Sequence, residues 1–317
     1  MVNKLLAIGE ALIDFIPTQT GVAMKDVNGF EPKVGGAPAN VCGAFTKLGG
    51  DAAMITQLGM DPFGDKIIEE FMQYGIGTEY IKRTSTANTS LAFVALMEDG
   101  NREFAFFRSP GADMLLTGED LEESWFKDTF ALHYCSVSLG DFPMKEAHKK
   151  AIEYARAANS IISFDPNVRL MLWNNPEQLR KVILEFMPLS HIIKISDEEL
   201  EFITGKTSIE KAKEILFTGD TKLILYTKGS GGAEAYTKAG YAAADSHMVQ
   251  AVDTTGAGDG FIGSFLYQLA EDGVTAETLE RLSAAQLTKY LEFSHRFCAK
   301  SVQIPGAIAS YPTKEEL

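Results

Sequence analysis

Residues 253–260 read Asp-Thr-Thr-Gly-Ala-Gly-Asp-Gly, and this stretch indicates how the 317-residue chain folds. Apolar residues follow it at helical spacing: Phe261, Ile262, Phe265, Leu266 and Leu269. A glycine-rich turn therefore opens an amphipathic helix.

Short apolar runs that end in Gly, Asp, Asn or Ser are typical of strands buried on both faces. They occur at 5–8, 53–56, 131–135, 161–164, 191–195 and 223–227. Helical stretches lie between several of them, and in 62–74 Asp61 can cap, Pro62 fits the first turn and Gly75 ends the helix. The alternation predicts a three-layer α/β/α sandwich with a mainly parallel sheet. In such sheets ligands bind beyond the carboxyl ends of the strands.

Two segments break this alternation and read as strands outside the main sheet. One is Leu12–Pro17 with its continuation to about Val34, and the other is Leu91–Phe107, with a hairpin turn expected at Glu98–Asn101. We expect a single domain over 1–317, with a small β-sheet from about 11–34 and 88–108 that closes over the site as a lid. Its edge strands could also pair across a homodimer interface.

Composition excludes several classes of protein. The formal net charge is −14, from 43 acidic against 29 basic residues, which disfavours nucleic-acid and anionic-membrane partners. Three cysteines lie far apart without a CxxC pair, so we expect no disulfide framework or zinc cluster and a cytoplasmic location. No uninterrupted apolar stretch approaches ~18 residues, so no membrane span is expected.

The turn at 256–258 could also take part in a reaction. Successive amides at a helix N-terminus, assisted by the helix dipole, can bind developing phosphate charge. Asp259 follows them and can accept the proton of an incoming hydroxyl, which completes the requirements of phosphoryl transfer. The alternatives are a simple glycine-rich cap or part of a GxGxxG motif, and the latter fails because Phe261 occupies the final glycine position.

Residues 253–259 resemble, residue for residue, the DTTGAGD signature of the ribokinase-like, or PfkB-type, carbohydrate kinases. Residues 35–41, 48–50 and 59–64 are similar to the family's first signature region. The resemblance implies a ribokinase-like fold, ATP and Mg²⁺ as cofactors, and a sugar substrate. It further implies Asp259 as general base, an anion hole at Gly256, Ala257 and Gly258, and sugar contacts from Asp14, Gly35, Gly36 and Asn40.

Two further segments match the family less specifically. Asp165–Arg169 resembles the DPN-x-R segment of fructokinases and ketodeoxygluconate kinases, which makes Arg169 a candidate substrate contact, with a surface salt bridge as the alternative. Lys194–Glu199 stands where the family has Asn-x-x-Glu, but with Ser196 in place of Asn. The resemblance implies that Lys194 and Ser196 bind ATP and that Glu199 orients a water on Mg²⁺. Ser-x-x-Glu is equally a helix capping box.

The ATP-binding residues of the expected site are also inferred from the resemblance to the family. The turn 227–232 is similar to the family's nucleotide-binding turn, which implies ATP contacts from Thr227, Lys228, Gly229 and Gly232, in addition to Gly258. Asp253 and Thr255 would help to hold a monovalent cation such as K⁺, and 298–306 would run near the adenine. Gly205–Thr207 imitates the end of a P-loop, but Leu200 breaks the spacing, so Gly205 reads as a helix stop.

Within the family, Gly9–Phe15, the Asp-Pro-Asn-x-Arg segment and Ser196 resemble bacterial-type fructokinases, which implies that D-fructose and ATP give fructose 6-phosphate and ADP. Ribokinase and 2-keto-3-deoxygluconate kinase are the alternatives, the latter because Arg108 and Arg169 could meet a carboxylate. From other classes, a non-catalytic sugar or nucleotide sensor remains open. A dinucleotide-binding oxidoreductase is disfavoured because the chain lacks an early GxGxxG.

Overall fold

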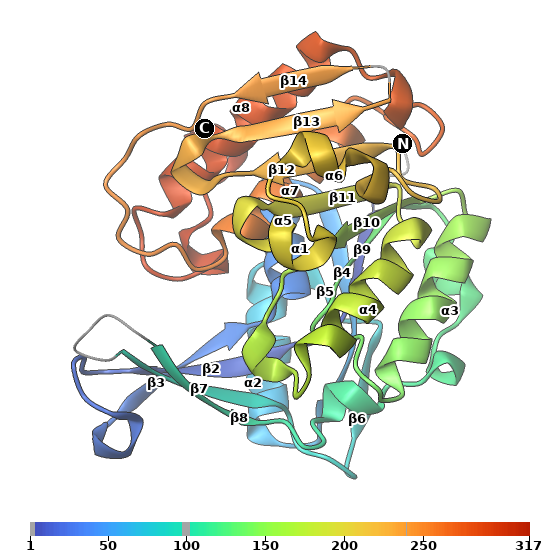
Figure 1. Cartoon of the computed structure of the whole chain (residues 1–317). Coiled ribbons are helices and arrows are strands. Elements are labelled where there is room, and N and C mark those ends of the chain that lie inside the picture. The colour runs from blue at the N-terminus through green and yellow to red at the C-terminus, as the bar shows by residue number, and fades with distance from the viewer. Residues whose placement is uncertain (1–3, 97–101, 239) are drawn as a thin grey trace.

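The main sheet runs through the centre of the molecule and has helices on both faces (Figure 1). The structure is a computed structural model that describes residues 4–96, 102–238 and 240–317. The hairpin turn expected at Glu98–Asn101 lies outside these described residues.

The main sheet has ten strands in the order β14-β13-β12-β11-β10-β9-β1-β4-β5, with β6 also paired to β4. All pairs from β12 to β5 and β6 are parallel, and β13 and β14 are antiparallel additions at one end. The strands are β1 (Lys4–Ile8), β4 (Asp51–Gly59), β5 (Ile76–Gly77), β6 (Ile81–Thr84), β9 (Thr129–Cys135), β10 (Ile161–Asp165), β11 (Ile192–Ser196), β12 (Leu223–Thr227), β13 (Ala233–Thr237) and β14 (Tyr241–Ala244).

The six apolar runs of the sequence all form strands of this sheet, which confirms the predicted fold class. They are buried because helices cover both faces, as the continuous apolar character of the runs indicated. The antiparallel pair β13 and β14 was not predicted. In β13 the half-buried Glu234 interrupts the apolar pattern, because its carboxylate pairs with Lys228 instead of facing the core.

Two apolar clusters fill the space between the sheet and its helices. One cluster packs α1, α2, α7 and α8 against one face, and the other packs α3, α4, α5 and α6 against the opposite face. The bounds are α1 (Ala37–Lys47), α2 (Pro62–Gln73), α3 (Met144–Ala157), α4 (Pro176–Phe186), α5 (Asp197–Thr204), α6 (Ile209–Leu216), α7 (Ala257–Glu271) and α8 (Ala284–Ser301). Short 3₁₀ helices include η2 (Ala112–Leu115), η3 (Gly118–Asp120), η5 (Leu170–Leu172) and η7 (Gly229–Gly231).

The helix signals of the sequence hold in detail. The Asp61 side chain accepts the amides of Phe63 and Gly64 at the start of α2, as a cap should. Gly205 ends α5 with a φ of 68°, the left-handed conformation in which glycine stops a helix. Within the described residues, no helix is both long enough and apolar enough to cross a membrane.

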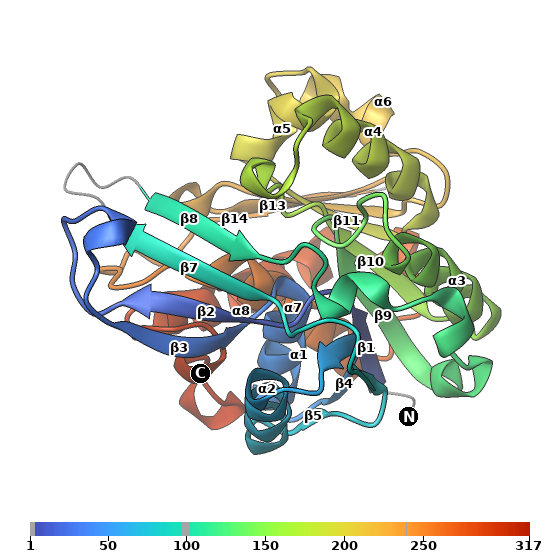
Figure 2. The same cartoon turned by 90° about the horizontal axis from the view of Figure 1, so that it is seen from below.

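A second sheet of four strands, in the order β3-β2-β7-β8, projects from the body of the molecule in both views (Figures 1 and 2). Its strands are β2 (Leu12–Pro17), β3 (Phe30–Gly35), β7 (Leu91–Leu96) and β8 (Arg102–Phe107). The pairs β2–β3 and β7–β8 are antiparallel, and β2–β7 is parallel. Rings on one face of this small sheet pack together, with Phe15 stacked on Phe93 at 4.4 Å between centroids. Both segments expected outside the main sheet are therefore found there.

Candidate active site

The glycine-rich turn is fixed by contacts behind it. Gly256 precedes α7 with a φ of 73°, and a Cβ there would lie 2.7 Å from both the Ala307 Cβ and the Tyr311 hydroxyl oxygen. The Tyr311 hydroxyl donates to the Gly256 carbonyl at 2.7 Å, and the Ala257 amide donates to the Thr254 carbonyl at 3.1 Å. Glycine is thus required by both conformation and space, and the turn presents the N-terminus of a 15-residue helix in one conformation.

Asp259 lies in the first turn of α7 and is only 9% exposed. The Asn40 Nδ2 of α1 donates to its Oδ2 at 2.9 Å, which joins two segments 219 residues apart. Burial raises the pKa of Asp259 to about 6, an effect that the Asn40 hydrogen bond opposes and the Asp165 charge reinforces. The Asn40 Oδ1 is buried without a hydrogen-bond partner in the described structure, so it can accept a hydrogen bond from a hydroxyl group of a ligand.

A buried ion pair lies next to Asp259. The Lys194 Nζ of β11 contacts the Asp165 Oδ2 at the end of β10 at 2.7 Å, with both side chains under 10% exposed. Burial is the largest influence on the pKa of Lys194 and lowers it, but the charges of Asp165, Glu199 and Asp259, with the Asp165 hydrogen bond, together raise the pKa, so the amine is a cation. A Cβ on Gly258 would lie 3.2 Å from that Nζ. A fixed positive charge therefore lies beside the Gly258 backbone, where an anion reaching the helix N-terminus would meet it.

The predicted sugar side lies in the small sheet. Asp14 stands on β2, and burial raises its pKa to about 6 with no contribution from a neighbouring charge. A Cβ on Gly35 would lie 2.1 Å from the Asp14 Oδ2, and one on Gly36 would lie 2.4 Å from the Glu10 carbonyl oxygen. Gly36 also has a φ of 121°. Gly35 is therefore explained by the close approach of β3 to β2, which brings backbone next to the Asp14 carboxylate, and Gly36 is explained by its approach to the chain just before β2.

Arg169 follows β10 on an exposed loop, and its Nη1 donates to the Val168 carbonyl at 3.1 Å. Its charge lowers the pKa of Asp259, so the guanidinium is close enough to influence the proposed base. Within the part of the chain that the structure describes, Arg169 forms no salt bridge, which was the alternative interpretation. The exposed guanidinium remains accessible to a substrate.

Ser196 and Glu199 form the capping box at the start of α5. The Glu199 Oε2 accepts the Ser196 amide at 2.9 Å, and its Oε1 accepts the Val168 amide at 2.7 Å. Both carboxylate oxygens thus hold backbone and fix the loop after β10 against α5. Within the described part of the chain, no group of three or more His, Cys, Asp or Glu side chains could enclose a metal ion. The donor set fits an ion that arrives with its own ligands better than a resident ion.

The turn 227–232 stands at the carboxyl end of β12, in line with the ends of β10 and β11. Gly232 has a φ of 89°, and a Cβ there would lie 2.4 Å from the Ala244 carbonyl oxygen. The Lys228 Nζ contacts the Glu234 Oε1 at 2.8 Å, so its charge is partly engaged within the turn. Thr227 is half-buried and Gly229 is exposed, which leaves these two positions accessible to a nucleotide.

Asp253 connects the segment before α7 to the segment after α8. Its Oδ1 accepts the Thr255 amide at 2.9 Å and the Thr255 hydroxyl at 2.7 Å, and its Oδ2 accepts the Gly306 amide at 2.8 Å. Both carboxylate oxygens therefore already accept hydrogen bonds, although each has lone pairs left. A cation at this position would share them with the backbone, together with the remaining lone pair of the Thr255 hydroxyl.

Sequence reasoning missed two side chains that support the glycine-rich turn. Tyr311 bonds the Gly256 carbonyl, and the Cys298 Sγ lies 3.3 Å from the Ala257 carbonyl oxygen. Neither residue belongs to a recognisable motif. Their roles depend on how the C-terminal segment packs behind α7, which no local pattern indicates. The Asp165–Lys194 pair was also missed, although the position of Asp165 after a buried run placed it on the ligand side.

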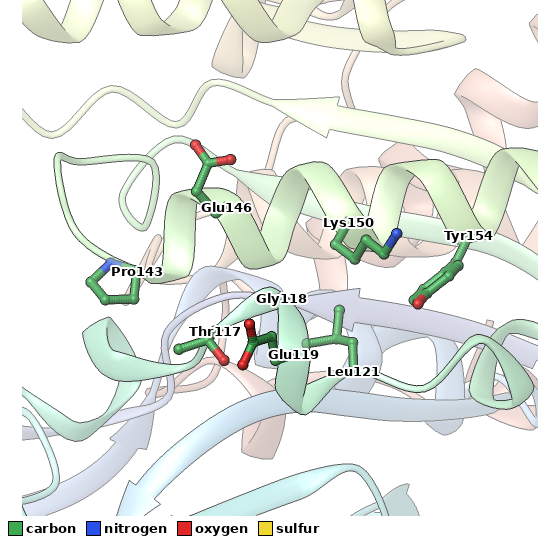
Figure 3. Close-up of a pocket in the computed structure, with 8 residues that line it drawn as sticks. All are labelled: Thr117, Gly118, Glu119, Leu121, Pro143, Glu146, Lys150 and Tyr154. Carbon is green, nitrogen blue, oxygen red and sulfur yellow. The ribbon is translucent and has the colours of Figure 1, made fainter.

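A hollow of about 870 Å³ lies between α3 and the η3 segment (Figure 3). The side chains in the close-up come from α3, from Pro143 just before it and from the chain facing it, and none belongs to the predicted site. The lining residues are Thr117, Gly118, Glu119, Leu121, Pro143, Glu146, Lys150 and Tyr154. Lys150 is already paired with Glu153, so this hollow has no free cation for a phosphate.

Comparison with known proteins adds independent findings. Residues 2–314 match the sequence profile described as pfkB family carbohydrate kinase. The chain is 40% identical over 316 residues to probable fructokinase-4 of Arabidopsis thaliana, covering 99% of this chain and 95% of the relative. The fructokinase of Xylella fastidiosa with bound ATP superposes with a TM-score of 0.92 at 34% identity, over 100% of this chain and 97% of that one. A double mutant of the Vibrio cholerae O395 fructokinase, with fructose, ADP and potassium ion bound, gives 0.86 at 28% identity, over 99% and 96%.

Proposed function

The chain belongs to the pfkB family of carbohydrate kinases, and from this premise we propose that it is an ATP-dependent fructokinase that converts D-fructose and ATP to fructose 6-phosphate and ADP. One observation carries the chemistry of this proposal. A buried carboxylate, Asp259, lies at the N-terminus of α7 with the Lys194 ammonium and the glycine-rich backbone next to it. The fructose assignment draws on the fructokinase relatives.

Asp259 acts as the general base in this proposal. It accepts the proton of the attacking sugar hydroxyl, and the Asn40 amide fixes the orientation of its carboxylate through the 2.9 Å hydrogen bond. The unpartnered Asn40 Oδ1 accepts a hydrogen bond from a second hydroxyl of the sugar. Asp14 and the backbone at Gly35 and Gly36 bind the hydroxyls at the other end of the sugar, because they present acceptors from the small sheet.

Charge that develops on the transferred phosphoryl group is stabilised by fixed positive partial charges. Gly256 to Gly258 supply backbone at the helix N-terminus, and Lys194 supplies a full charge held by Asp165. Arg169 adds a second cation from the exposed loop. Thr227, Lys228, Gly229 and Gly232 bind the remaining phosphates of ATP, together with Ser196 and the Gly258 backbone. The adenine lies along 298–306.

Divalent and monovalent ions enter this proposal as partners of ATP. Mg²⁺ bound to the phosphate oxygens of ATP supplies charge neutralisation when it is present. Glu199 would orient one of its water ligands, since both carboxylate oxygens are already fixed by backbone amides. Asp253 and Thr255 would share their oxygens with K⁺ beside the glycine-rich turn.

The small sheet serves as a lid in the proposal, because it carries Asp14 and stands apart from the main sheet (Figure 2). Covering the sugar with this sheet would exclude water, which otherwise competes for the phosphoryl group. Its edge strands are β3 and β8, and Phe107 at the end of β8 is 64% exposed. A homodimer through this sheet remains a prediction. A reducing cytoplasm suits the free thiols of Cys42, Cys135 and Cys298.

A substrate panel tests the proposed function directly. ADP formation with fructose, ribose, 2-keto-3-deoxygluconate and adenosine should give the highest kcat/KM for fructose. Of the two arginines that could bind a substrate carboxylate, Arg108 is paired with Asp113, which disfavours the acid sugar. An equal or higher kcat/KM on another sugar would remove the fructose assignment, and no ADP formation with any of them would favour a sensor.

We also expect a defined dependence of rate on pH. A base must be ionised to accept a proton, and burial raises the pKa of Asp259 to about 6. The kcat should therefore fall about tenfold per pH unit below pH 6 and be level above it. Asp14→Asn should retain this acid limb, and Asp259→Asn should lose it. The limb is measured from initial rates at saturating substrate; its survival in Asp259→Asn would assign it to another group.

A further inference from the structure

The backbone passes between the two sheets at four places. These are the stretch from β1 to β2, the stretch from β3 to α1, the approach to β7, and the stretch from β8 to η2. Polar side chains stand at three of these crossings: Glu10 after β1, Ser90 before β7, and Arg108 after β8. All three are buried or nearly so, and all three are remote from the glycine-rich turn in sequence.

Arg108 is the centre of this group. Its Nε and Nη2 donate to the Asp113 Oδ2 at 2.9 and 2.5 Å, and the two side chains are 7% and 1% exposed. The Arg108 Nη2 also donates to the Ser138 hydroxyl at 3.2 Å, and that hydroxyl donates to the Glu10 Oε2 at 2.8 Å. The Ser90 hydroxyl donates to the Asp113 Oδ1. One guanidinium thus connects three crossings of the small sheet to the body of the molecule.

This arrangement has a cost that an apolar contact would avoid. Three ionisable groups have been removed from water, and burial is the largest influence on the pKa of Glu10, which it raises against the opposing charge of Arg108. Buried ion pairs are often no more stabilising than apolar side chains of similar size, and in some proteins they instead specify one geometry. The planar guanidinium of arginine, with its donors in a fixed arrangement, restricts the geometry of such a pair more strictly than the ammonium of lysine does. The network is therefore suited to fixing an angle between two bodies.

We propose that the network of Glu10, Ser90, Arg108, Asp113 and Ser138 is the fixed joint of the small sheet, and that Arg108 is a positioning residue for phosphoryl transfer. Asp14 stands on β2, which begins two residues after Glu10, whereas Asp259 stands on α7 of the main body. The joint determines where Asp14 holds the sugar relative to Asp259. Asp113 keeps the guanidinium at the joint and away from the substrate.

The inference rests on the proposed function for its kinetic readout. Arg108→Lys keeps the charge but loses the planar guanidinium. We expect the KM for sugar to rise about tenfold and kcat to fall about tenfold, with the KM for ATP within about twofold, since a misplaced sugar affects alignment and the nucleotide turn lies on the main sheet. These kinetic assays use the sugar that gives the highest kcat/KM with the wild type, so that their outcome does not depend on which sugar is the true substrate.

A matched control and two milder variants keep the test decisive. Arg156 lies on α3 and forms an exposed ion pair with Asp220. Arg156→Lys alters this pair and should leave kcat and the KM values for sugar and ATP within about twofold of the wild type. Ser138→Ala removes only the hydroxyl between Arg108 and Glu10 and should raise the KM for sugar about threefold. Asp113→Asn removes one charge and should resemble Arg108→Lys. If Arg108→Lys fails to fold, these two variants decide.

Hydrogen exchange separates this inference from the proposed function, because it needs no turnover. Amides of β2, β7 and β8 should exchange faster in Arg108→Lys than in the wild type, while those of β9 to β12 stay unchanged. Unchanged hydrogen exchange in the small sheet, or a KM for ATP that rises in parallel with the KM for sugar, would contradict the proposal that this network is a joint. A wild-type chain that phosphorylates none of the sugars would refute only the proposed function.

Discussion

Asp259→Asn should lower kcat by about 10²–10⁴ with little change in sugar affinity, the usual effect of removing a positioned general base. Asparagine keeps the shape of the side chain and can still accept the Asn40 hydrogen bond through its own oxygen. It cannot accept a proton. The measurement is kcat by coupled ADP formation, with sugar affinity from equilibrium binding; near-normal turnover would exclude Asp259 as the base.

Stability provides the control for this variant. Burial raises the pKa of Asp259 from 3.8 to about 6 in the folded protein, so the ionised carboxylate opposes folding above about pH 6, and this penalty disappears below 3.8. Removing the charge should therefore leave the melting temperature at pH 7 equal to or above that of the wild type. A loss of activity accompanied by a marked fall in melting temperature would point to damage of the fold.

Gly258→Val should reduce kcat by roughly 10² or more, because it places a side chain where the transferred group must approach the helix N-terminus. A Cβ here would already lie 3.2 Å from the Lys194 Nζ, so the larger side chain also displaces the neighbouring cation. Gly258 lies within α7 and has no positive φ, so backbone strain does not explain the loss.

Gly118→Ala is the matched control for Gly258→Val. A Cβ on Gly118 makes an ordinary 3.4 Å contact with the Lys150 Cβ, far from the glycine-rich turn, and turnover should stay within about twofold. Steady-state kinetics in both substrates distinguish the outcomes. An effect of Gly258→Val confined to the KM for sugar would contradict an anion site at this position.

Much of the fold could be predicted because its signals are local. The six buried runs, the Asp61 cap and the Gly205 stop each depend on residues within one element. The order of the strands could not be predicted, because β1 lies between β4 and β9 through contacts that no single segment encodes. The same limit explains why β13 and β14 were missed.

The candidate site divides in the same way. Asp259 and its glycines are contiguous, so one motif identifies them, and resemblance added Asp14 and Asn40. The Asp165–Lys194 pair joins residues 29 positions apart and forms only because β10 and β11 are neighbours in the sheet. Glu199 illustrates the opposite case: its capping role could be predicted from spacing, and the structure shows both of its oxygens engaged with backbone.

The four backbone crossings between the sheets separate two traits that selection can then act on independently. Under the proposed function, Asp14 on β2 and Gly35 on β3 contact the sugar from the small sheet, while the phosphoryl-transfer apparatus resides in α7 and the ends of β10 to β12. Substitutions in the projecting sheet could therefore change which sugar is accepted without rebuilding the transfer chemistry. Such a molecule can diversify its substrate range in small steps, each of which leaves a working kinase.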